Sequence, residues 1–158
     1  MASKHTTGPD LAKAIEHRIT AFISESIEAR QSIKAVYLYG SILKGEKFRP
    51  NSDIDLAFLL EPALYKQDPL IYSAPAYMAA NEISSMLNRK TDVVILNAAS
   101  IETAYLVVTT GIVIYDTDHE NRLEYEAALR GMYYDFKPFL QQLRAKSMLR
   151  HNSREPGI

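Results

Sequence analysis

The sequence of 158 residues contains no cysteine, and this absence limits the chemistry open to the protein. Without thiols there can be no disulfide, no cysteine nucleophile and no thiolate metal site. Any bound metal would need oxygen or imidazole ligands, which favours hard divalent cations such as Mg²⁺.

Long hydrophobic runs are also missing from the sequence. No stretch approaches the roughly 18 apolar residues that cross a bilayer, and residues 1–10 contain no apolar segment of the kind found in secretory signals. We therefore expect a cytoplasmic protein that does not enter the membrane. The net charge is only −1, so the surface lacks the basic field that attracts nucleic acid, and direct nucleic-acid binding is not expected.

The composition and length fit one globular domain. Hydrophobic residues make up 47% of the chain and charged residues 23%, as is ordinary for a folded protein. No internal repeat or linker divides the chain. We expect a flexible N-terminus over residues 1–9, a single domain over residues 10–146, and a flexible basic tail over residues 147–158.

Hydrophobic spacing predicts helices that alternate with strands, which is typical of an α/β domain with a small mixed sheet. The expected strands are residues 34–39, 53–60, 92–96 and 112–115. The expected helices are residues 10–30, a segment ending near Asn88, residues 100–110, and a long C-terminal helix starting near Asp118.

Caps and prolines refine this prediction. Asp10 is the expected cap of the first helix and Ser100 the expected cap of the third. Residues 61–69 contain two prolines and are expected to form a loop. Pro138 lies inside the long C-terminal helix and should kink or break it.

A Gly-Ser pair and an Asp-x-Asp pair form the most informative stretch. Gly40 and Ser41 follow the first expected strand, and Asp53 and Asp55 open the second. A glycine at such a strand end lets phosphate oxygens approach the backbone closely, and Ser41 can add a hydroxyl donor. Because side chains alternate along a strand, the two aspartates project from the same face.

Two neighbouring carboxylates favour a divalent cation, because their mutual repulsion would otherwise raise the pKa of at least one of them. Asp92 begins a neighbouring expected strand and can supply a third carboxylate. Three carboxylates beside a phosphate seat fit a two-metal phosphoryl-transfer site. Lys44 is the nearest candidate to contact a triphosphate, while Lys47 and Arg49 equally fit a solvated loop.

Each part of this pattern also has a purely structural explanation. Isolated Asp-x-Asp and Gly-Ser pairs are common by chance, and Asp92 could be a solvated residue at a strand start. The combination is what favours catalysis, since a strand ending in Gly-Ser, a strand opening with Asp-x-Asp and a later acidic strand have few structural reasons to occur together.

These residues resemble the nucleotidyltransferase superfamily, whose polymerase beta-like fold carries Gly-Ser, a spacer of about ten residues and Asp-x-Asp. The closer similarity is to minimal nucleotidyltransferases (MNT), and within them to MntA-like antitoxins of HEPN/MNT toxin–antitoxin systems. Residues 37–60 carry the signature, residues 91–97 resemble the third acidic strand, and residues 110–134 resemble the closing strand and helix. One departure is the spacer between Ser41 and Asp53, which has eleven residues.

The resemblance implies roles for the individual residues. Gly40 and Ser41 would bind the triphosphate of ATP. Asp53 and Asp55 would hold Mg²⁺, which is expected as two ions. Asp92 would be the third carboxylate, and it would serve either as a metal ligand only or as the catalytic base as well. The implied activity is transfer of AMP from ATP to a tyrosine of a HEPN-type ribonuclease toxin, which silences the toxin within a hetero-oligomer.

Three alternatives remain open at this point. The protein could neutralise a toxin by binding alone, or it could transfer a nucleotide to a small-molecule hydroxyl. Arg144 and His151 also imitate the Arg-His pattern of the HEPN ribonucleases themselves. Those ribonucleases are helical bundles, whereas this sequence has clear β segments.

Overall fold

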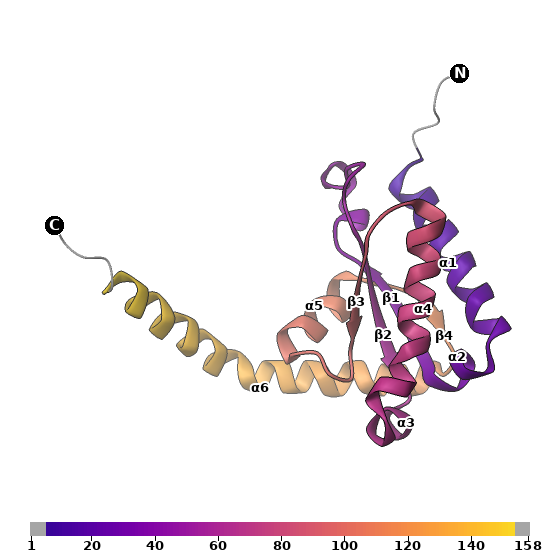
Figure 1. The fold of residues 1–158 in the computed structure, drawn as a ribbon. Helices are drawn as coiled ribbons and strands as arrows, with labels where there is room; N and C mark the ends of the chain where they lie inside the picture. The colour runs from indigo at the N-terminus through magenta and orange to yellow at the C-terminus, as the bar shows by residue number, and fades with distance from the viewer. Residues whose placement is uncertain (1–5, 154–158) are drawn as a thin grey trace.

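A four-stranded mixed sheet organises the protein in the computed structural model, which describes residues 6–153 (Figure 1). The strand order is β3-β2-β1-β4. β1 (Ile33–Tyr39) is antiparallel to both β2 (Ile54–Leu60) and β4 (Ile112–Asp116), while β3 (Thr91–Ile95) runs parallel to β2. All four expected strands are confirmed, with ends within one residue of those predicted.

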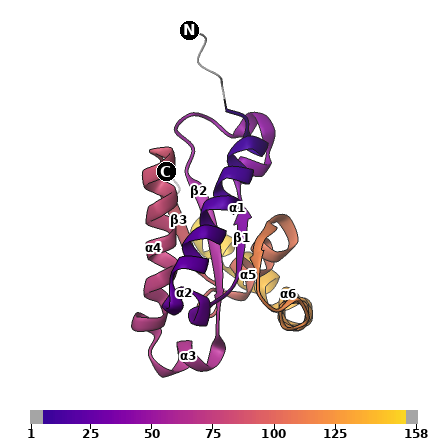
Figure 2. The same cartoon turned by 90° about the vertical axis from the view of Figure 1, so that its right-hand side faces the viewer.

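One face of the sheet is covered by α1 (Gly8–Glu25), α2 (Ile27–Ser32) and α4 (Pro69–Leu87), which lie together on one side in Figure 2. Apolar residues at helical spacing in α1 meet alternate residues of the central strands, because strand side chains point to opposite faces in turn. The fully buried members of this larger core include Ile15, Ile19, Ile23, Val36, Leu38, Leu56, Phe58 and Ile83.

The opposite face carries α5 (Ile101–Thr110) and the first part of α6 (His119–Asn152). α6 runs across the strands, since it is seen lengthwise in Figure 1 and end-on in Figure 2. This second core is smaller and includes Ala35, Tyr37, Ala57, Leu59, Leu96, Val107 and Leu129. The central strands read as apolar on both faces because both faces are packed against helices.

The prolines in residues 61–69 begin helices, so the prediction of a loop there was wrong. Pro62 occupies the first turn of α3 (Pro62–Gln67), and Pro69 occupies the first turn of α4. Proline fits a first turn, where its missing N–H would have no partner in any case. Asp68 caps α4 by accepting a hydrogen bond from the Ile71 amide.

The first expected helix is two helices, which corrects the prediction for residues 10–30. Ser26 is extended between α1 and α2, and its hydroxyl caps α2 by accepting from the Ala29 amide. Asp10 is not the cap of α1 either. Thr7 caps α1 and accepts from the Asp10 amide, because Pro9 already belongs to the first turn. Ser100 caps α5 as predicted.

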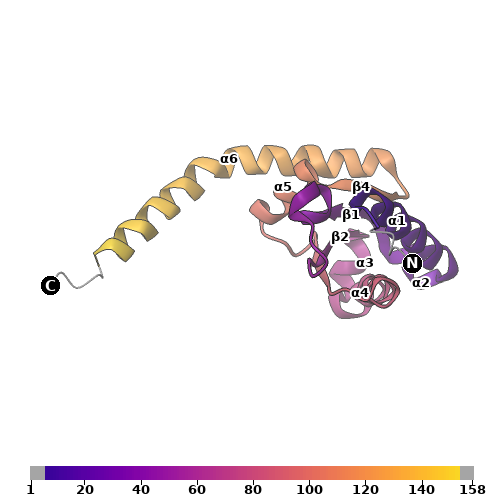
Figure 3. The same ribbon diagram turned by 90° about the horizontal axis from the view of Figure 1, so that it is seen from above.

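The long C-terminal helix continues through Pro138, and its second half bends away from the body (Figures 1 and 3). A proline inside a helix removes one backbone hydrogen bond and its ring crowds the preceding turn, so the helix bends. Residues 147–152 belong to α6, and residues 1–5 and 154–158 of the expected flexible ends lie outside the described residues. Between residues 6 and 153, no helix combines the length and apolar character needed to cross a membrane.

A buried polar network fastens α6 to the sheet. The Tyr37 hydroxyl donates to Glu126 Oε1 over 2.8 Å, and Arg122 donates to the same oxygen over 2.8 Å and, through Nε, to Asp116 Oδ2 over 2.7 Å. Burial and the hydrogen bond to Glu126 raise the pKa of Tyr37 well above its usual range, so its hydroxyl remains a donor. The network joins β1, β4 and α6 below the end of the sheet that bears the aspartates.

Replacing Glu126 tests how much this network stabilises the fold. Glu126→Ala leaves the Tyr37 hydroxyl and part of Arg122 buried without a partner, so we expect it to lower the free energy of unfolding by about 3 kcal/mol in urea titrations. Arg130→Ala is the control, because Arg130 reaches the same carboxylate over 3.7 Å from the solvent side. It should cost less than about 1 kcal/mol. Equal losses in the two variants would contradict this account.

Candidate functional site

Three residues of the site are neighbours in the sheet register. Tyr39 pairs with Asp55 across the antiparallel strands, and Asp55 pairs with Asp92 across the parallel strands. Residues that are two apart on a strand point to the same face of the sheet. All three residues therefore lie on the face covered by α5 and α6, next to the smaller core. β1 ends here while β2 and β3 begin, so the predicted convergence of Asp55 and Asp92 is confirmed.

Gly40 lies directly against the Asp55 carboxylate. Its φ of 85° is in the left-handed region, and a Cβ at this position would lie 2.1 Å from Asp55 Oδ2. Only glycine tolerates both the backbone conformation and the close approach. Ser41 follows at once and opens the short 3-10 turn η1 (Ser41–Leu43), so the Gly-Ser turn and the aspartate share one corner of the sheet.

Asp53 joins this group through Lys90. The Lys90 ammonium lies 3.9 Å from Asp53 Oδ2 and 3.4 Å from Asp92 Oδ1. The backbone holds this arrangement, since the Ile54 amide donates to the Lys90 carbonyl over 2.9 Å where β2 and β3 begin. The three predicted carboxylates therefore gather at one end of the sheet, with a cation beside them that the sequence reading missed.

Electrostatics confirm that these groups share one environment. Burial raises the pKa of Asp55, and the charges of Asp92 and Asp53 raise it further, while the Lys44 ammonium opposes the shift. Burial and the charges of Asp55 and Asp92 also raise the pKa of Tyr39. Lys44 is exposed, yet it lies near enough to Asp55 to lower the pKa of that carboxyl.

The chemistry of these donors suits Mg²⁺. Carboxylate oxygens are the ligands it prefers, and a bound cation would relieve the repulsion that raises the pKa of Asp55. Across residues 6–153, no three His, Cys, Asp or Glu side chains are already drawn together as a ligand set. Lys90 lies between two of the three carboxylates, so Asp53 and Asp92 are separated by an ammonium group.

The eleven-residue spacer folds into a compact, anchored loop. It contains η1, a second 3-10 turn η2 (Gly45–Lys47) and a turn in which the Arg49 amide donates to Ser52 Oγ over 2.8 Å. Arg89 donates to the carbonyls of Arg49 and Ser52 over 2.9 and 3.0 Å, and its guanidinium stacks on Phe48.

The basic residues around the site therefore divide into separate roles. Lys47 and Arg49 are exposed and make no ion pair within the part of the chain that is described. Arg89 anchors the loop, whereas Lys90 reaches the carboxylates. The signal for both missed residues was present in the sequence, because a basic pair stands immediately before the strand that carries Asp92.

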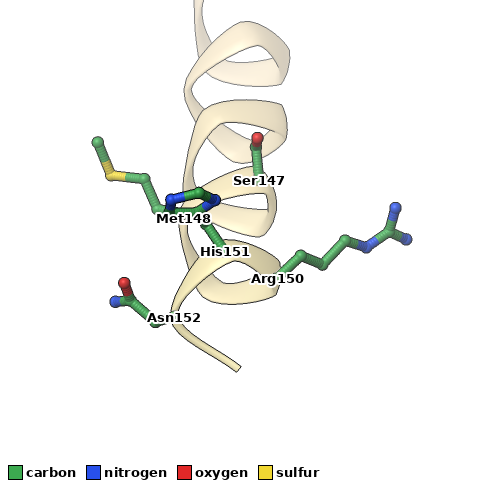
Figure 4. A pocket seen from close by; sticks show the side chains of 5 residues that line it. All are labelled: Ser147, Met148, Arg150, His151 and Asn152. Atoms are coloured by element: carbon green, nitrogen blue, oxygen red, sulfur yellow. The ribbon is translucent and has the colours of Figure 1, made fainter. Parts of the chain in front are cut away.

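Arg144 and His151 do not form a second site. Arg144 pairs with Glu102 over 2.8 Å. His151 lines a shallow hollow along the last turns of α6, where every lining residue comes from this one helix and the side chains of Arg150 and His151 diverge (Figure 4). The sheet-based fold rules out the helical bundle that the HEPN interpretation requires.

Comparisons with known proteins agree with this fold. The family described as "Polymerase beta, Nucleotidyltransferase" matches residues 22–120, which contain every strand and all three aspartates. No curated protein sequence matches the chain.

Solved structures of toxin–antitoxin complexes contain similar chains. A chain of a toxin–antitoxin complex with AMP-PNP has a TM-score of 0.62 at 25% identity, covering 84% of this chain and 98% of that chain. A chain of the MntA–HepT toxin–antitoxin has a TM-score of 0.58 at 22% identity, covering 86% and 98%. A chain of the complex of tri-AMPylated Shewanella oneidensis HEPN toxin with MNT antitoxin has a TM-score of 0.60 at 20% identity, covering 87% and 98%.

The family match, the four-stranded mixed sheet and the long α6 confirm the predicted polymerase beta-like fold. The family match spans more than half of the chain and includes the whole carboxylate site. This chain belongs to the polymerase beta nucleotidyltransferase family.

Proposed function

We propose that this protein is an Mg²⁺-dependent adenylyltransferase that transfers AMP from ATP to a tyrosine hydroxyl of a partner HEPN ribonuclease toxin, and that it acts as the antitoxin. The observation that carries the proposal is the convergence of Asp53, Asp55 and Asp92 beside Gly40. A site of this composition suits phosphoryl transfer, in which the protein mainly positions the reactants and stabilises charge.

The nature of donor and acceptor is supported by the similar complexes. The toxin–antitoxin complex at 25% identity contains AMP-PNP, an analogue of ATP. The Shewanella oneidensis complex contains a HEPN toxin that carries three AMP groups. Both features favour ATP as the donor and a HEPN protein as the acceptor for this chain as well.

The residues would divide the work as follows. Gly40 and Ser41 would receive the triphosphate where the backbone is most accessible, and Lys44 would add a positive charge beside it. Asp53, Asp55 and Asp92 would hold Mg²⁺. When bound, magnesium neutralises charge on the phosphates and makes an attacking hydroxyl more acidic. Asp92 stands at the outer strand of the carboxylate group, next to the exposed edge of the sheet, where it could also accept the hydroxyl proton.

The main alternative is an antitoxin that works by binding alone. A specific feature favours catalysis over this reading. Burial and like charges raise the pKa of Asp55, so retaining three carboxylates together destabilises the unliganded site. A protein that only bound its partner would gain nothing from this arrangement.

Transfer of labelled AMP tests the proposal directly. Purified protein is incubated with [α-³²P]ATP, Mg²⁺ and the HEPN partner, and label on the partner is measured. Because each change removes one proposed ligand of the cation, Asp53→Asn and Asp55→Asn should each reduce transfer by at least about 100-fold. Asp135→Asn, an exposed carboxyl on α6, is the matched control and should retain full activity.

Further measurements with the same variants identify the acceptor and distinguish the alternative functions. Intact mass spectrometry of the partner should show additions of AMP, and Tyr→Phe replacement in the partner should remove them. Undiminished labelling by the Asp53→Asn and Asp55→Asn variants would reject the site. Protection of cells from the toxin by the same inactive variants would instead favour neutralisation by binding alone.

Gly40→Ala tests the corner where the turn meets the carboxylate. The new methyl group would displace the Asp55 carboxylate, and a misplacement near 1 Å can cost about 100-fold in kcat/KM. Gly45→Ala is a well-matched control, since Gly45 also has a positive φ, of 56°, but a Cβ there meets nothing within 4 Å. It should cost about 1 kcal/mol of stability and leave activity near that of the wild type. Equal activity losses would show that backbone strain alone explains the effect.

The raised pKa of Asp55 also predicts a gain in stability when the charge is removed. In the folded protein this pKa lies above the ordinary value of 3.8, so ionisation of Asp55 opposes folding. Asp55→Asn should therefore raise the melting temperature in EDTA at pH 7, and the gain should shrink as pH falls through the raised pKa, where wild-type Asp55 is protonated. Asp135→Asn provides the baseline. A lower melting temperature for Asp55→Asn at pH 7 would contradict the electrostatic account.

A further inference from the structure

Lys90 occupies a position that neither the fold nor the reaction obviously requires. Its ammonium reaches Asp92 Oδ1 over 3.4 Å and Asp53 Oδ2 over 3.9 Å, and these two carboxylates belong to different segments of the chain. The position is set by the backbone, because the Lys90 carbonyl accepts a hydrogen bond from the Ile54 amide. The backbone of Lys90 is therefore fixed beside the strand that carries Asp55, while its exposed side chain can move.

Arg89 and Lys90 are adjacent basic residues with different contacts. Arg89 is committed to the protein, with two hydrogen bonds to loop carbonyls and a stacked contact on Phe48. Lys90 makes no such contact, and 72% of its side chain is exposed, against 39% for Asp53 and 47% for Asp92. The ammonium thus lies on the solvent side of the carboxylates, where it can leave without disturbing the core.

The charge around the site explains what the ammonium does. Burial raises the pKa of Asp55, the charges of Asp92 and Asp53 raise it further, and Lys44 acts against that shift. Lys90 adds a second positive charge, beside both Asp53 and Asp92. A divalent cation held by the same oxygens would carry charge of the same sign into the same place, and the two cations would repel each other.

We propose that Lys90 is an internal counter-cation of the metal site: its ammonium neutralises Asp53 and Asp92 when no metal is bound, and it must move away from them for a divalent cation to bind. This inference rests on the proposed function, because it takes the three carboxylates as the metal ligands. Lys90 is then a positioning residue that lowers the affinity for metal and stabilises the metal-free site.

Metal affinity, measured without nucleotide, tests this role. Isothermal titration of Mg²⁺ and electron paramagnetic resonance titration of Mn²⁺ would compare the wild type with Lys90→Gln, Lys90→Arg and Lys66→Gln. Since the competing charge is largely exposed, Lys90→Gln should bind each metal about three- to tenfold more tightly. Lys90→Arg keeps the charge and should bind equally or more weakly. Lys66→Gln, an exposed change on α3, should match the wild type.

Thermal unfolding supplies a second readout that a passive surface lysine would not affect. In EDTA, Lys90→Gln should melt at a lower temperature than the wild type, because three carboxylates then share less positive charge. Saturating Mg²⁺ should remove the difference, since tighter binding adds more stability to the variant.

The outcomes separate this inference from the proposed function. Unchanged or weaker metal binding by Lys90→Gln, while the wild type binds Mg²⁺ and Asp55→Asn does not, would overturn the role of Lys90 and leave the catalytic site in place. Metal binding that is unaffected by Asp53→Asn and Asp55→Asn would overturn both, because the cation would then lie elsewhere.

Discussion

Like-charge repulsion among Asp53, Asp55 and Asp92 is the constraint on which the candidate site depends. The sheet register places Asp55 beside Asp92, and the start of β2 brings Asp53 to the same end. Burial and then the charges of Asp92 and Asp53 raise the pKa of Asp55, with Lys44 opposing the shift, while Lys90 lies beside Asp53 and Asp92. Carboxylates that repel one another favour a bound cation, which is why the proposed function assigns these three residues to Mg²⁺.

The rest of the fold holds this corner in place. The left-handed conformation of Gly40 ends β1 against the Asp55 carboxylate, and Arg89 fixes the loop that follows. On the same face, α5 and α6 cover the inner part of the sheet, and the network of Tyr37, Glu126 and Arg122 fastens α6 one pleat away from the carboxylates. The carboxylates therefore lie at one end of the sheet, next to the part that α5 and α6 cover.

Much of this was predictable from the sequence, and the reasons for the exceptions are physical. The strands and the carboxylate group were found because apolar runs and an Asp-x-Asp pair are local signals of fixed period. The helix break at Ser26 was missed because the hydrophobic spacing continues across it, and α3 was missed because prolines were read as breakers when they occupy first turns. The basic pair before β3 is visible in the sequence, but the contact of Lys90 with Asp53 depends on the pairing of β2 with β3, which this local signal does not show.

A crystal structure with Mn²⁺ and a non-hydrolysable ATP analogue would test the central claim most directly, because manganese is located by its anomalous scattering. The account predicts anomalous density within about 2.0–2.3 Å of carboxylate oxygens of Asp53 and Asp55, with Asp92 beside it, the triphosphate against Gly40, and the Lys90 ammonium displaced from both of its partners. Manganese bound away from these aspartates, or a triphosphate seated elsewhere while all three carboxylates remain without metal, would contradict it.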